Sequence, residues 1–164
     1  MLHPLTALEH VLPIVVLALL AGQQGAATAR RVMVALPAGL SLGALAAFAY
    51  SGSSAVGPVN LGSFVVLGGL VALSRPLPPL AVPALALGFG VTHGYANGAA
   101  LVPGMSHGLF LGGLITAGVV ASTLIAAAVV SLRPAWCLIA VRVVGAWIAA
   151  IGLLMTALTL RAGG

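Results

Sequence analysis

The stretch HGLFLGGLITAGVVASTLIAAAVVSL, residues 107–132, contains no Asp, Glu, Lys or Arg. A helix of about 20 apolar residues crosses the ~30 Å hydrocarbon core of a lipid bilayer. This stretch is therefore long and apolar enough to be a transmembrane helix. Similar apolar stretches recur along the chain, and together they predict an all-α fold: an integral membrane bundle of about six transmembrane helices.

The composition of the whole chain supports the same fold class. Of its 164 residues, 62% are hydrophobic and 4% are charged, and the mean hydropathy is +1.25. A soluble domain has about 25% charged residues, so 4% is too few to cover a water-facing surface. We therefore expect the lipid bilayer, or a larger apolar complex, to surround the helices.

Turn-forming and polar clusters divide the chain into its predicted helices. The predicted helices span residues 5–25, 31–50, 57–74, 79–97, 107–132 and 135–161. The loops between them are too short to form a domain, so residues 1–164 are expected to form a single transmembrane domain. Residues 11–21 also match the apolar core of a signal peptide, with Ala-Thr-Ala at 27–29 as a cleavage site. Because Glu9, and no Arg or Lys, precedes residues 11–21, we expect a genuine first helix.

The charges predict an orientation in the membrane. The chain has six arginines, no lysine and one acidic residue, Glu9. The loops on one side hold Arg30, Arg31, Arg75 and Arg133, and the opposite side holds only Arg161. Cytoplasmic loops are enriched in Arg and Lys, so we expect a multi-pass protein of the bacterial inner (plasma) membrane with both termini extracytoplasmic. The arginines form no basic patch, and no nucleic-acid partner is expected.

Glycine spacing indicates close packing between helices. Small residues four apart let membrane helices approach closely. Such steps occur at Gly39/Gly43, Gly90/Gly94, Gly94/Gly98 and Gly108/Gly112. The same glycine-rich faces are candidate contacts for other membrane-protein subunits.

In this topology the histidines and the one acidic residue gather on the extracytoplasmic side. They are His3, Glu9 and His10 at the start of the first helix, His93 with Asn97 near the end of the fourth, and His107 at the start of the fifth. His93 and Asn97 are four residues apart and share a helix face. Imidazole, carboxylate and amide groups suit a borderline divalent ion such as nickel, cobalt, copper or zinc. The candidate metal ligands are His3, Glu9, His10, His93 and Asn97.

Structural roles remain open for the same residues. His3 and His107 can lie at the level of the lipid headgroups, and Glu9 with His10 can form a hydrogen-bonded pair. His93 with Asn97 can provide an interhelical hydrogen bond. No catalytic set of Ser, His and an acid occurs at a suitable spacing, so no enzyme activity and no resident cofactor are expected.

Two segments resemble the motifs of the HupE/UreJ family, small nickel/cobalt permeases. Residues 3–10, HPLTALEH, resemble the family's HPxxGxDH signature, and residues 92–101, THGYANGAAL, resemble its FHGxAHGxE segment. The resemblance implies that His3, Glu9, His10 and His93 are metal ligands or line the metal's path.

The chain departs from these motifs at several positions. Ala7 stands for Gly, Glu9 for Asp, Thr92 for Phe, Asn97 for the second His and Ala100 for Glu. Losing a histidine and an acid from one helix removes metal ligands and negative charge together. The resemblance thus implies a divergent nickel/cobalt permease with a degraded metal site. The alternative is a structural or assembly subunit of a larger membrane complex that no longer transports metal.

Overall fold

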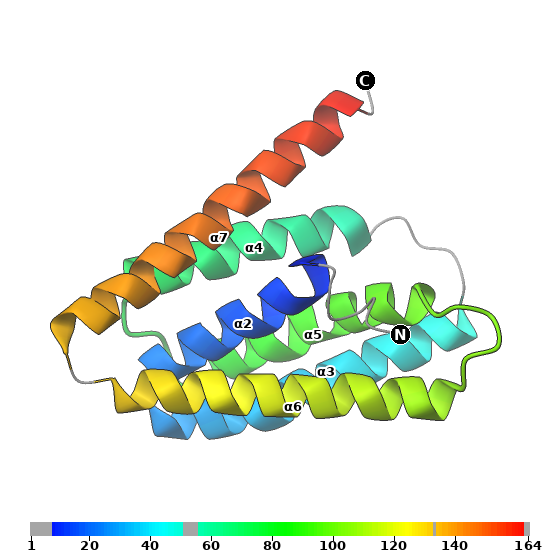
Figure 1. The fold of residues 1–164 in the computed structure, drawn as a ribbon, viewed down its shortest axis with the longest axis horizontal. Helices are drawn as coiled ribbons and strands as arrows, with labels where there is room; N and C mark the ends of the chain where they lie inside the picture. The colour runs from blue at the N-terminus through cyan, green and yellow to red at the C-terminus, as the bar shows by residue number, and fades with distance from the viewer. Residues whose placement is uncertain (1–7, 51–55, 133, 163–164) are drawn as a thin grey trace.

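The computed structural model describes residues 8–50, 56–132 and 134–162. In these ranges the chain forms six α-helices and no strand, which confirms the all-α prediction. The helices are α2 (Leu8–Gln23), α3 (Ala26–Ala49), α4 (Val56–Leu73), α5 (Ala81–Ala99), α6 (His107–Ser131) and α7 (Ala135–Ala162) (Figure 1).

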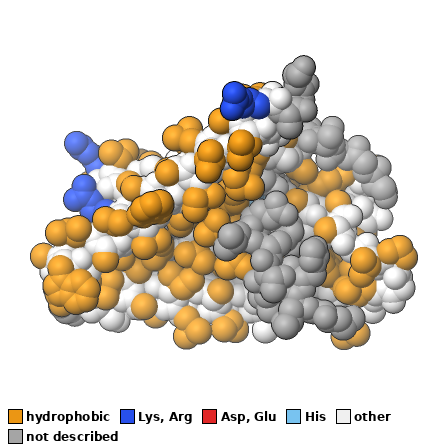
Figure 2. Space-filling model, turned by 45° about the horizontal axis from the view of Figure 1, so that its top comes forward, with side chains coloured by type: hydrophobic (Ala, Val, Ile, Leu, Met, Phe, Trp, Pro, Cys, Tyr) orange, Lys and Arg blue, Asp and Glu red, His pale blue; other side chains and the backbone are white. Residues whose placement is uncertain are grey.

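Length and hydropathy identify four of these helices as membrane spans. They are Ala26–Ala49, Val56–Leu73, His107–Ser131 and Ala135–Arg161. The apolar part of α2, Val11–Gln23, is shorter, and α5 has 19 residues, several of them polar. Figure 2 shows hydrophobic side chains over most of the visible described surface, with arginines only near its edges. The chain is therefore a multi-pass membrane protein whose apolar surface contacts the bilayer.

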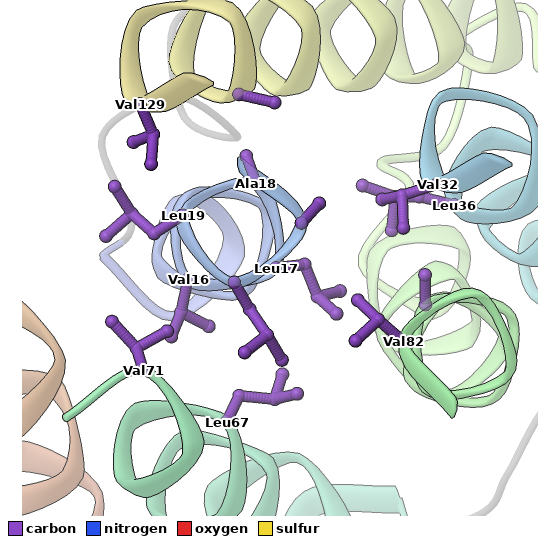
Figure 3. Packing of buried hydrophobic residues seen from close by; sticks show 14 of the residues in the cluster. Val16, Leu17, Ala18, Leu19, Val32, Leu36, Leu67, Val71, Val82 and Val129 are labelled. Atoms are coloured by element: carbon purple, nitrogen blue, oxygen red, sulfur yellow. The ribbon is translucent and has the colours of Figure 1, made fainter. Parts of the chain in front are cut away.

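Helix α2 lies at the centre of the bundle. Figure 3 looks along α2 and shows side chains of α3, α4, α5 and α6 pointing at it from several sides. Every residue from Val16 to Gly22 is buried. A helix that is hydrophobic all round must be surrounded by protein or lipid, and here the surrounding helices supply Val32, Leu36, Leu67, Val71, Val82 and Val129.

Glycines hold α3 and α5 close together. A Cβ atom on Gly39 would lie 3.0 Å from Gly90 Cα, and one on Gly94 would lie 2.7 Å from Leu40 Cα. Three of the four predicted glycine steps, Gly39/Gly43, Gly90/Gly94 and Gly94/Gly98, therefore lie in the interface between α3 and α5. The fourth step is different, because a Cβ on Gly112 would meet nothing within 4 Å.

Hydrogen bonds join the helices at the end of the bundle where α2 and α4 terminate. Gln23 Nε2 donates to Val71 O at 3.1 Å, Gln24 Nε2 donates to Arg75 O at 3.0 Å, and Arg31 Nη1 donates to Pro79 O at 3.2 Å. We call this end, with Arg30, Arg31 and Arg75, the arginine end.

The opposite end of the bundle carries His93 and His107, and we call it the histidine end. Here the hydroxyl of Tyr95 donates to Tyr50 O at 2.7 Å, which joins the last turns of α3 and α5. Arg30, Arg31 and Arg75 thus lie toward the end of the bundle opposite the described histidines, whereas Arg161 lies in the last turn of α7.

The predicted start of the second helix at residue 31 is wrong. Helix α3 begins at Ala26, so that Arg30 and Arg31 lie inside its first two turns. The chain instead reverses at Gly25, whose φ of 93° lies in the left-handed region that glycine adopts without steric cost. The polar residues Arg30 and Arg31 therefore do not mark the turn between α2 and α3. The other predicted helix ends within the described ranges agree with the structure to within two residues.

Arg142 of α7 reaches the C-terminal end of α4. Its Nε donates to Ala72 O at 2.9 Å, one residue before α4 ends. The guanidinium therefore reaches the arginine end and satisfies one of the carbonyl groups that a helix leaves open at its C-terminus.

Candidate metal-binding site

His93 is the centre of the candidate site. Its side chain is only 4% exposed, and it lies in α5 between Gly90 and Gly94. Those two glycines face α3, and the imidazole reaches a different helix, α4. The glycine face fixes how α5 is rotated and thereby directs His93 into the bundle.

Ser63 of α4 is the interhelical partner of His93. Ser63 is fully buried, and its Oγ lies 2.9 Å from His93 Nε2. The ring of the neighbouring Phe64 lies 6.0 Å from the imidazole, measured between ring centroids. The interhelical hydrogen bond expected from the structural role of His93 is therefore present.

Ser63 Oγ contacts two groups at once. The Ser63 hydroxyl has one proton, and it donates this proton to Asn60 O at 2.6 Å. Ser63 Oγ can then accept a hydrogen bond from a protonated Nε2 of His93.

Two amide side chains complete the group that we call the polar cluster: Asn60, Ser63, His93 and Asn97. Asn97 is 5% exposed, and its Nδ2 donates to His93 O at 2.8 Å within α5. Asn60 Nδ2 donates to Thr92 O at 3.4 Å, across the contact between α4 and α5. The Oδ1 atom of Asn60 is buried and has no hydrogen-bond partner, so it is an acceptor with unused capacity.

Sequence reasoning found His93 and Asn97 but missed Asn60 and Ser63. The sequence does contain a signal for them, because Asn60 and Ser63 are two polar residues, three apart, in the otherwise apolar helix Val56–Leu73. That signal was weak because serine in a membrane helix commonly bonds its own backbone. Only the packing of α4 on α5 turns Ser63 toward His93.

The backbone of Glu9 and His10 lies in the first turn of α2, whereas their side chains, and all of His3, fall outside the described residues. The bond from Gln23 to Val71 aligns α2 with α4 near the arginine end. A helix rises 1.5 Å per residue, so His10 lies about 20 Å before Gln23 along α2, and Ser63 lies about 12 Å before Val71 along α4. The first turn of α2 therefore lies farther from the arginine end than Ser63 does.

The proposed meeting of Glu9 and His10 with His93 stays a prediction. Among the described residues, no three His, Cys, Asp or Glu side chains form a group that could hold a metal ion. A complete set of ligands would therefore need the N-terminal residues that the sequence motif contains.

His107 is placed differently from His93. It is exposed at the start of α6, and its ring lies edge-on to Phe48 with 4.4 Å between the ring centroids. This position fits a histidine at the membrane boundary and lies outside the polar cluster.

A comparison with protein families agrees with these observations. The family model described as HupE / UreJ protein matches residues 1–155. The chain therefore belongs to the HupE/UreJ family, which confirms the resemblance of its two motifs and relates it to nickel and cobalt transport. No curated protein and no solved structure gives a match.

Proposed function

We propose that this protein is a permease for a divalent transition-metal ion, Ni²⁺ or Co²⁺, and that His93 binds the ion inside the bundle. The observation that carries the proposal is the burial of His93, at 4% exposure, inside the polar cluster, where its imidazole contacts Ser63 of α4. Imidazole nitrogen suits both ions. An ionisable residue inside a membrane protein is also costly to bury and usually functional.

The charge distribution supports entry of a cation at the histidine end. Glu9 is the only acidic residue of the chain, and it lies in the first turn of α2, farther from the arginine end than Ser63. Arg30, Arg31 and Arg75 lie at the other end. In this proposal an entering cation meets His3, Glu9 and His10 before it reaches His93 and Asn97, and it does not pass Arg30, Arg31 or Arg75 on the way.

The arginine end is proposed to face the cytoplasm of a bacterium, because cytoplasmic ends of membrane proteins are rich in arginine. The histidine end, with both chain termini, then faces the extracytoplasmic side. In this orientation the transport direction is uptake.

Uptake of radioactive nickel by cells that lack their own nickel importer tests the proposal. Cells that express the protein should accumulate more nickel than cells with an empty vector. His93→Gln should lower this uptake at least about tenfold. Mutating even a residue that only supports a metal ligand lowers metal affinity or activity about 10- to 100-fold, and here the proposed ligand itself is removed. Glu9→Ala and His10→Ala should also lower it.

His107→Gln is the matched control, because it removes a histidine of the same end that lies outside the polar cluster. Its uptake should equal that of the unmodified protein at equal abundance in the membrane. If the unmodified protein raises neither nickel nor cobalt uptake, the permease proposal is wrong. A stable protein partner after purification in mild detergent would then favour the structural or assembly subunit.

A further inference from the structure

Arg30 and Arg31 line an open hollow on the outer face of α3. The hollow has a volume of about 480 Å³, and its other lining residues are Ala27 and Val34. The four residues stand at positions i, i+3, i+4 and i+7, which is the spacing of one helix face. All four are exposed, so the hollow opens to the surroundings of the bundle.

The charge of this hollow is positive and is not offset by an acidic side chain. Arg31 Nη1 donates to a neutral carbonyl, Pro79 O, at 3.2 Å. Within the part of the chain that the structure describes, no hydrogen bond involves the Arg30 guanidinium. The one acidic residue of the chain, Glu9, lies in the first turn of α2, about 20 Å before that helix ends at Gln23. The two guanidinium groups are therefore available to an anion from outside the chain.

The fold adds a third arginine to the same edge of the bundle. Gln24 Nε2 donates to Arg75 O at 3.0 Å, which places Arg75 beside the turn from which α3 starts. Figure 1 shows this turn and the connection from α4 to α5 at the same end of the molecule. Arginines that are scattered in the sequence thus gather where the helices leave the membrane.

Beyond the two arginines, the outer face of α3 is apolar. Val34 is 72% exposed, Leu42 is 57% exposed, and Ala38 between them is also exposed. Helix α3 is a membrane span, so these side chains face lipid tails. From Arg31 to Leu42 the helix rises roughly 16 Å, about half of the ~30 Å hydrocarbon core. One helix face therefore offers guanidinium groups at the headgroup level and an apolar strip as long as one lipid tail.

We propose that the hollow is a binding site for an anionic phospholipid of the leaflet at the arginine end. The lipid phosphate binds Arg30 and Arg31, and an acyl chain lies along Val34 and Leu42. Guanidinium groups form paired hydrogen bonds with phosphate oxygens, and basic pockets beside transmembrane helices bind anionic headgroups. Free phosphate would use the arginines but not the apolar strip, so the strip favours a lipid. This site is separate from the polar cluster and does not depend on metal transport.

Native mass spectrometry of the full-length protein, titrated in detergent with phosphatidylglycerol, measures the dissociation constant of the first bound lipid. Phosphatidylcholine with the same acyl chains is the comparison, because its headgroup has no net charge. A basic residue near an anionic lipid surface contributes about fivefold in affinity. The unmodified protein should therefore bind phosphatidylglycerol at least about fivefold more tightly than phosphatidylcholine.

Arg30→Gln is the test variant, because Arg31 also bonds to Pro79 O and its loss would alter the packing of α3. Arg30→Gln should weaken phosphatidylglycerol binding about fivefold and leave phosphatidylcholine binding unchanged. Arg30→Lys, which keeps the charge, should retain most of the affinity. Arg161→Gln is the matched control, since it removes the same charge from an exposed position in the last turn of α7, outside the hollow.

Equal affinity of the unmodified protein for the two lipids overturns the inference, and this comparison requires no variant. Equal weakening by Arg30→Gln and Arg161→Gln also overturns it, because net charge would then explain the binding. Displacement of phosphatidylglycerol by an excess of inorganic phosphate would show a site for free anions and contradict the role of the apolar strip. Each of these results is independent of nickel uptake, so the permease proposal stands or falls separately.

Discussion

Asn60 carries a buried carbonyl oxygen, Oδ1, to which no group donates a hydrogen bond. A buried polar atom without a partner costs about 1–3 kcal/mol of stability. Its Nδ2 recovers little of this cost, because the bond to Thr92 O is long, at 3.4 Å. A residue that is unfavourable for folding and lies beside His93 is a candidate for contact with the ion or with its water.

Replacing Asn60 by leucine, an apolar residue of similar size, should therefore separate stability from transport. The thermal midpoint in detergent should stay the same or rise, because a buried unsatisfied atom is removed. Nickel uptake by Asn60→Leu should fall several-fold. Thr123→Val is the control, since Thr123 Oγ1 in α6 is also buried without a partner but belongs to no part of the polar cluster. Equal uptake by the two variants would show that the Asn60 amide has no part in transport.

The residues of the site were predictable only in part. His93 and Asn97 are unusual in an apolar helix, so the sequence alone identifies them as a pair on one face. Ser63 is not unusual, because a serine hydroxyl in a helix finds an acceptor in its own backbone, as Ser122 does with Val119 O. The distinction between these two serines depends on which helix packs against each of them.

At the scale of the helices, hydropathy predicts where the helices are but not how they pack against each other. Hydropathy located all six described helices, because a helix that faces lipid or is buried in the bundle must be largely apolar. It misplaced the start of α3, because Arg30 and Arg31 are polar but continue the helix, and the chain reverses at Gly25. Glycine spacing was informative about close packing but did not say which helices approach each other.

The interface between α3 and α5 depends on Gly94. A Cβ atom at this position would overlap the backbone of Leu40, 2.7 Å away at its Cα. Gly94→Ala should therefore push the helices apart and lower stability by about 1–3 kcal/mol, as overpacking commonly does. Because His93 is the preceding residue, nickel uptake should fall as well. The thermal midpoint of the purified protein in one detergent measures the first effect.

Gly112→Ala provides the comparison on α6, where an added Cβ meets nothing within 4 Å. Alanine is favoured over glycine in a helix by about 0.5–1 kcal/mol, so this variant should be as stable as the unmodified protein or more stable. If Gly112→Ala and Gly94→Ala lower the thermal midpoint by the same amount, Gly112 is also closely packed, for example against a second protein chain.

On the scale of the whole molecule, the two ends of the bundle differ in chemistry. The arginine end is joined by hydrogen bonds from Gln23, Gln24, Arg31 and Arg142 to backbone carbonyls of α4 and of the turn that follows it. The first turn of α2 and the polar cluster lie farther toward the histidine end than these hydrogen bonds do. A path for a cation therefore has a preferred entrance, and its direction in the cell depends on which end faces the cytoplasm.

Single cysteines can determine this orientation. Cys137 is the only cysteine of the chain, so Cys137→Ser gives a background without thiols. In that background, Leu80→Cys places a thiol at the arginine end and Val102→Cys places one at the histidine end, at positions that are 70% and 58% exposed. Because arginine accumulates on the cytoplasmic side, a membrane-impermeant maleimide added to spheroplasts should label Val102→Cys and spare Leu80→Cys. Both should be labelled after lysis, which shows that each thiol is reactive. The reverse pattern would place the histidine end in the cytoplasm, and a site that opens there would not receive metal from outside the cell.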